Sequence, residues 1–93
     1  MTDTLFKDIK IALADMREAR EDIDIARPGF NVVCGYRFDG QDTQEAIELY
    51  RAGEHEPIKT VYVVSDRYNP FDEVLERAVR IIASTMNAAR RPL

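Results

Sequence analysis

Apolar residues at the start of the chain recur at the spacing of an amphipathic helix. Between residues 4 and 25 the intervals between them are four, three, four, three and four, and the residues are Leu5, Ile9, Ala12, Met16, Ala19 and Ile23. Residues three and four positions apart are neighbours on the surface of an α-helix. The spacing therefore predicts one continuous helix over residues 4–25, with an apolar stripe along one side.

Acidic residues follow the same segment at a helical interval. Asp8, Asp15 and Asp22 are seven residues apart, and Glu18 lies on an adjacent face. Residues 1–25 contain seven acidic and four basic residues, so negative charge is concentrated at this end of the chain. A row of carboxylates on a rigid helix can steer association with a basic partner surface. The alternative is an ordinary solvated helix side whose acids form ion pairs with basic neighbours.

Four further elements are predicted from local patterns. Alternation of apolar residues predicts a strand over 30–38. An acidic capping position followed by an apolar face predicts a second helix over 42–52. A run rich in Val, Ile and Tyr predicts a strand over 58–64. A proline at the first helical position and an apolar stripe behind it predict a third helix over 70–90.

These elements follow the order α-β-α-β-α. We expect a single domain over residues 1–93, of class α/β or α+β, in which three helices pack on a short two-stranded sheet. A helical crossover normally makes the two strands parallel, although an antiparallel pair or a third strand within residues 53–60 also fits the pattern. Each arrangement leaves a strand edge exposed, and exposed edges pair with other chains. A homodimer is therefore also expected.

Charge and cysteine content narrow the functional classes. The net charge is −4, whereas direct nucleic-acid binding needs a basic surface. Cys34 is the only cysteine, so no intrachain disulfide can form. No apolar run approaches the ~20 residues of a membrane span, and the first residues lack the pattern of a signal peptide. We therefore expect a cytoplasmic protein that binds neither nucleic acid nor membrane.

The segment Ser65–Asn69 is the best candidate for a small-ligand site. It follows a predicted strand and opens a helix, which is where α/β proteins often bind ligands. Free N–H groups at a helix start favour an anion, and Arg67 would add positive charge. With parallel strands, Arg37 lies at the same edge of the sheet. The alternative function is thus a homodimer that binds a nucleotide or another small anion through Ser65, Asp66, Arg67, Asn69 and Arg37.

His55 and Cys34 are the candidates for metal or thiol chemistry. His55 lies between two glutamates, but the chain contains no second histidine, and alternating residues in a short loop need not converge on one metal ion. Cys34 lies on the apolar alternation of a predicted strand, where cysteine behaves as a small hydrophobic residue. We therefore expect no catalytic residue, no metal ligand and no cofactor.

The remaining signals favour an interaction protein. Tyrosine, of which the chain has four, is enriched at interfaces because it combines area with a polar tip. We expect a small non-enzymatic protein that binds a larger partner with a basic surface through Asp8, Asp15, Glu18, Asp22, Tyr36 and Tyr68. Compact acidic proteins of this kind are common among phage and mobile-element products that block host machinery. By that analogy the expected role is inhibition of a nucleic-acid-handling host complex.

Overall fold

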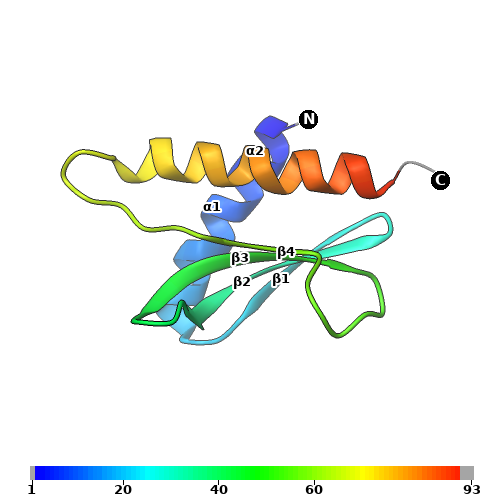
Figure 1. The fold of residues 1–93 in the computed structure, drawn as a ribbon, viewed down its shortest axis with the longest axis horizontal. Helices are drawn as coiled ribbons and strands as arrows, with labels where there is room; N and C mark the ends of the chain where they lie inside the picture. The colour runs from blue at the N-terminus through cyan, green and yellow to red at the C-terminus, as the bar shows by residue number, and fades with distance from the viewer. Residues whose placement is uncertain (1, 91–93) are drawn as a thin grey trace.

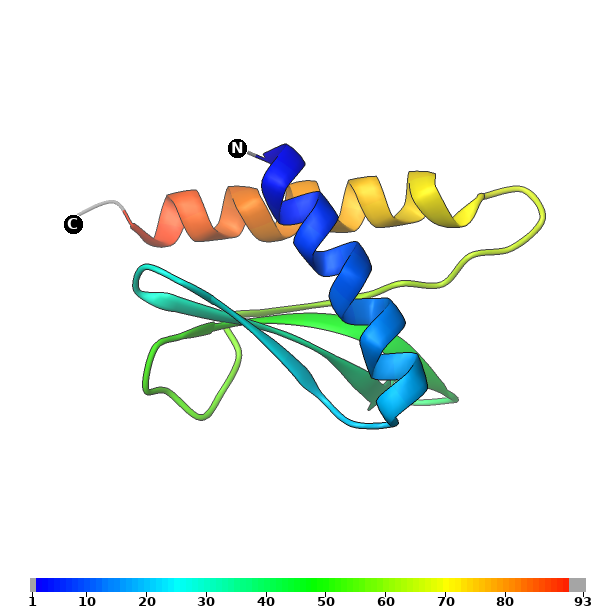
Figure 2. The same cartoon turned by 180° about the vertical axis from the view of Figure 1, so that it is seen from behind.

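Two helices and four strands form the fold in the computed structural model, which describes the backbone of residues 2–90 and the side chains of residues 4–90. In chain order they are α1 (Thr2–Ala19), β1 (Ile23–Arg27), β2 (Phe30–Phe38), β3 (Thr43–Arg51), β4 (Lys59–Tyr62) and α2 (Phe71–Ala89). The strands form one antiparallel sheet in the order β1-β2-β3-β4. Both helices lie on the same side of this sheet, and α1 crosses α2 obliquely (Figure 1 and Figure 2). The fold class is therefore α+β.

The predicted two-stranded sheet with three helices is wrong. Its first error lies in the helix predicted over 4–25, which ends at Ala19. Arg20 adopts a positive φ of 60°, a left-handed conformation that commonly ends a helix. Ile23 and Ile25 then alternate with exposed residues in β1. Their β-branched side chains pack on the core from a strand instead of continuing the helical stripe.

The Pro28-Gly29 pair explains why the chain turns back after β1. It forms a two-residue hairpin loop, because Arg27 pairs with Phe30 in the register of β1 and β2. Proline sets the backbone angle of the first turn position, and Gly29 supplies the positive φ of 81° at the second. Proline and glycine are also common just beyond the end of a helix. The structure uses them as a strand-to-strand turn.

The second error is the helix predicted over 42–52, which is the strand β3. Its Gln, Glu, Ala and Leu residues are good helix formers. However, Ile47 and Leu49 are fully buried on the helix side, and β3 pairs with β2 over its whole length, from Thr43 to Arg51. Pairing and burial therefore override the local preference for a helix.

The other three predicted elements lie where the sequence placed them. The strand over 30–38 coincides with β2, the strand over 58–64 contains β4, and the helix over 70–90 contains α2. β2 and β4 point the same way because each pairs antiparallel with β3. Met1 and residues 91–93, which the single-domain prediction also covers, lie outside the described residues.

The core lies between the helices and one face of the sheet. Each large apolar side chain buried there contributes about 1.5–3 kcal/mol relative to an exposed one. The apolar stripe predicted for the first helix is correct as far as Met16, since Ile9 and Met16 have no exposed surface. The fully buried side chains include Ile9, Leu13, Met16, Val32, Ile47, Leu49, Leu75 and Ile82. Neither of the two helices within residues 2–90 has the length and apolar character needed to cross a membrane.

Candidate functional site

The face of the sheet turned away from the helices is polar and aromatic. Successive side chains of a strand point to opposite faces, so the register fixes which residues share this face. One row across the four strands consists of Asp24, Val33, Glu48 and Thr60. We call this surface the open face; it comprises Asp22, Asp24, Ala26, Asn31, Val33, Gly35, Arg37, Gln44, Ala46, Glu48, Tyr50, Thr60 and Tyr62.

Glu48 is buried although it lies on the open face. Only 7% of its surface is exposed. Its Oε1 accepts hydrogen bonds from Arg37 Nε at 2.9 Å and from the Tyr50 hydroxyl at 3.0 Å, and its Oε2 accepts one from the Thr60 hydroxyl at 3.3 Å. A buried carboxylate is tolerated when it is paired and hydrogen bonded. These contacts therefore fix Glu48 in one position at the centre of the face.

Arg37 joins this carboxylate to a second one. Its Nη1 and Nη2 donate to the two carboxylate oxygens of Asp22 at 3.1 and 2.8 Å. The hydrogen bond between Arg37 and Asp22 raises the pKa of Arg37 and lowers the pKa of Asp22. Gly35 lies beneath this pair, and a Cβ atom there would collide with both Asp22 and Arg37. The glycine therefore provides the space in which the guanidinium lies against the strand.

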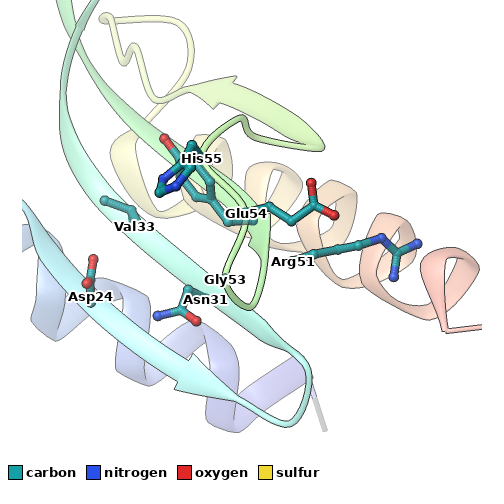
Figure 3. Close-up of a pocket in the computed structure, with 8 residues that line it drawn as sticks. Asp24, Asn31, Val33, Arg51, Gly53, Glu54 and His55 are labelled. Atoms are coloured by element: carbon teal, nitrogen blue, oxygen red, sulfur yellow. The ribbon is translucent and has the colours of Figure 1, made fainter.

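A shallow depression of about 280 Å³ lies next to this network. Figure 3 shows Asp24 and Asn31 on neighbouring strands, with His55 on the β3–β4 loop and Glu54 extending away from Asp24. Burial, followed by the hydrogen bond to Glu48, raises the pKa of Tyr50, which also lines the depression. The full lining consists of Asp24, Asn31, Val33, Tyr50, Arg51, Gly53, Glu54 and His55.

Carboxylates outnumber cations on the open face. The acids Asp22, Asp24 and Glu48 face a single arginine, Arg37. Asp24 is exposed, and none of the ion pairs between side chains of residues 4–90 includes it. The face thus has a net negative charge, with Asp24 available to an external cation.

The acidic row predicted on the first helix does not form a single row. Asp8 forms an ion pair with Arg27 at 2.5 Å. Asp15 and Glu18 are exposed on α1, whereas Asp22 lies beyond the end of the helix and belongs to the open face. Because the helix ends before Arg20, the seven-residue spacing does not place Asp22 on the same helix side as Asp8 and Asp15.

The two predicted interface tyrosines lie on different elements, a strand and a loop. Tyr36 packs against the core on the helix side of β2. Tyr68 is 75% exposed in the loop between β4 and α2, and the Arg67 guanidinium lies 4.9 Å from its ring centre. Neither tyrosine belongs to the open face, which has Tyr50 and Tyr62 instead.

The structure does not assemble Ser65–Asn69 and Arg37 into one anion site. The Asp66 carboxylate accepts the backbone N–H groups of Tyr68 and Asn69 at 2.8 and 2.9 Å, and these bonds lower the pKa of Asp66. The loop therefore satisfies these N–H groups with its own carboxylate. Arg37 lies at the same end of the sheet, but its guanidinium is bound to Asp22 and Glu48. Ser65 lines a separate depression.

Cys34 and His55 lie in contrasting surroundings. Cys34 is fully buried, and this burial raises the pKa of its thiol to about 12. The thiolate needed for nucleophilic or metal chemistry is therefore scarce near neutral pH. His55 lines the depression of the open face. In the part of the chain that the structure describes, no group of three or more His, Cys, Asp or Glu side chains is placed to hold a metal ion.

Sequence reasoning missed Asp24, Glu48 and Tyr50 as members of a site. One signal was available: a glycine inside a strand pattern, here Gly35, often marks a close approach by another group. No family model matches this chain, and comparisons with curated proteins and with solved structures found no match. Function is therefore inferred from the geometry and charge of the open face.

Proposed function

We propose that this chain is a small non-enzymatic protein-binding module whose open face docks a basic surface of a larger protein. The observation that carries this proposal is the excess of carboxylates on a sheet face that neither helix covers. Complementary charge guides encounter and selects the partner. The acids of the open face replace the predicted helix row as the principal contact residues.

Hydrogen bonds within the chain already fix several side chains of the open face, and this supports a binding role. Asp22, Arg37 and Glu48 are held by hydrogen bonds within the chain, so little side-chain freedom is lost when a partner docks. Tyr50 and Tyr62 add aromatic area beside them, and tyrosine is prominent among residues that dominate interface energetics. Asp24 is the carboxylate that a lysine or arginine of the partner would meet.

The proposed partner also suggests a role in inhibition. Basic protein surfaces hold nucleic acid by neutralising phosphates. An acidic module docked on such a surface would compete with nucleic acid for it. Binding of the module and of a polyanion such as heparin to the partner is therefore expected to be mutually exclusive.

A charge-reversal pair tests the proposal. Peptides selected from a random display library on the native chain are expected to include a class rich in Arg and Lys. Asp24→Lys should weaken the binding of this class at least tenfold, because like charges then face each other. Asp15→Lys, which reverses an exposed aspartate on α1, serves as the matched control and should change affinity less than twofold. Biolayer interferometry measures both affinities, and repeating them in high salt should reduce the difference.

Two results would reject the open face as the site. One is a set of selected peptides that contains no class rich in basic residues. The other is an equal loss of binding in the Asp15→Lys and Asp24→Lys variants, which would return the contact to the α1 side. Circular dichroism of each variant shows whether a loss of binding reflects a loss of fold.

A further inference from the structure

A second surface lies along the outer edge of β4. Here α2 and the edge strand border an apolar groove of about 330 Å³, separate from the open-face depression. Val64 and Ile81 are 48% and 42% exposed at the groove. We call this surface the β4–α2 groove; its apolar lining includes Val61, Tyr62, Val64, Val74, Ala78 and Ile81, of which Tyr62 also belongs to the open face.

The backbone beside the groove is open on one side. β4 ends the sheet and pairs with β3 alone among the described strands. Pairing with β3 continues past the strand as far as Val63, whose N–H donates to the Glu45 carbonyl at 2.8 Å. An edge strand presents unpaired N–H and C=O groups to a further strand. An extended segment is therefore the backbone geometry that this edge accepts.

The one charged residue that lines the groove, among the residues that the structure describes, is basic. Arg77 lines the groove, Lys59 begins β4, and Arg67 lies in the loop whose Asn69 also lines it. Arg77 donates one hydrogen bond to Asn69, at 3.3 Å. None of the ion pairs between side chains of residues 4–90 includes these three cations. Arg77 in the groove and Lys59 at the start of β4 are thus cations without an ion-pair partner among the described side chains, and they are complementary to an acidic ligand.

We infer that the β4–α2 groove binds an extended acidic segment of another protein, which adds to the sheet as a fifth strand beside β4. Alternate apolar side chains of that segment occupy the groove, and its carboxylates meet Lys59 and Arg77. A second copy of this chain fits less well, because a two-fold β4–β4 contact uses the same patch twice. Such a contact would bring the unpaired cations of both copies together.

Two matched peptide libraries test this inference. Both contain nine-residue peptides with Val, Ile, Leu or Phe at alternate positions, and the intervening positions are Glu or Thr in one library and Lys or Thr in the other. The acidic library should yield binders and the basic library should not. Ile81→Glu should weaken these binders at least tenfold, whereas Ile11→Glu should leave their affinity within twofold. Ile11 is the matched control because it is an isoleucine exposed on α1, at 61%.

Backbone chemistry then separates strand addition from simple apolar contact. N-methylation of alternate amides on one edge of a selected peptide should abolish binding, whereas methylation on the other edge should leave it. Asp24→Lys should have no effect, so this inference and the proposed function can fail independently. The inference is overturned if the acidic library gives no binders or if both isoleucine variants lose affinity equally. Self-association of the native chain that Ile81→Glu abolishes would assign the groove to a second copy.

Discussion

The open face and the β4–α2 groove differ in how their charged groups are held. On the open face, Arg37 donates to both Asp22 and Glu48. At the groove, Arg77 donates only to the neutral side chain of Asn69 among the hydrogen bonds of residues 4–90. The charges of Asp22, Arg37 and Glu48 are thus part of the folded architecture, whereas those of the groove serve no ion pair within the described chain. Substitutions within the Asp22–Arg37–Glu48 network should therefore affect stability, whereas substitutions of the groove cations should affect binding alone.

The largest expected effect on the free energy of unfolding comes from removing Arg37 of the open face, with Arg77 of the groove as the comparison. Arg37→Ala leaves the buried Glu48 carboxylate without its cation, and breaking a buried pair in this way costs about 3 kcal/mol. Arg77→Ala should change the free energy of unfolding by less than about 0.5 kcal/mol, as is usual for an exposed residue. Urea unfolding followed by circular dichroism measures both values. Equal losses in the two variants would remove the distinction between the regions.

A smaller effect is expected at Gly35, which leaves room for the network without joining it. Gly35→Ala places a Cβ atom against Asp22 and Arg37, so the two side chains must shift. Both contacts are side-chain ends that can move, and an added Cβ also restricts the unfolded chain. We therefore expect a net loss of about 1 kcal/mol in unfolding free energy, in the range of moderate overpacking.

The Arg37→Ala background supplies the control for Gly35. Without the guanidinium, the Cβ atom has less to displace, so Gly35→Ala should become neutral or stabilising there. A double-mutant cycle measured by urea unfolding isolates this coupling. An unchanged cost of Gly35→Ala in that background would mean that the glycine serves the strand and not the ion pair.

The fold could be predicted where its signals are local. The apolar stripe through Ile9 and Met16 and the proline start of the last helix identified most of both helices, and alternation identified β2. The failures are at residues 20–25 and 42–52, where pairing with β2 decides the conformation. Helix propensity in the second segment is overridden by a partner strand that a single local window does not contain.

The candidate site was less predictable than the fold for the same reason. Glu48 becomes a partner of Arg37 only through the register of β2 and β3. This register places Val33 opposite Glu48, so Arg37 and Glu48 share one face of the sheet and the Arg37 side chain reaches Glu48 along it. Asp22 was assigned to a helix row on the basis of its spacing, yet it pairs across the sheet with Arg37. Gly35 was the one residue in this region that indicated a close contact, because a glycine inside a strand often marks such a contact.

The last and smallest predicted effect on the open face is the contribution of the ionised Asp22 carboxylate to stability, which depends on pH. The hydrogen bond from Arg37 lowers the pKa of Asp22 from its ordinary 3.8, so the ionised form is favoured in the folded state. This contribution is present above about pH 4 and is lost as the pH falls through the folded pKa. Since 51% of the Asp22 side chain is exposed, its contribution should stay below about 1 kcal/mol.

Asp22→Asn should therefore destabilise the chain at pH 6 by less than about 1 kcal/mol and by almost nothing near pH 2. Asp66→Asn is the matched control, because backbone N–H groups lower the pKa of Asp66 and no cation is involved. Salt at about 1 M should reduce the effect of Asp22→Asn more than that of Asp66→Asn, since it screens attraction between exposed charges. Urea unfolding across pH and salt measures both. A cost of Asp22→Asn that persists at pH 2, or in the Arg37→Ala background, would show that Asp22 stabilises the open face through packing and not through its charge.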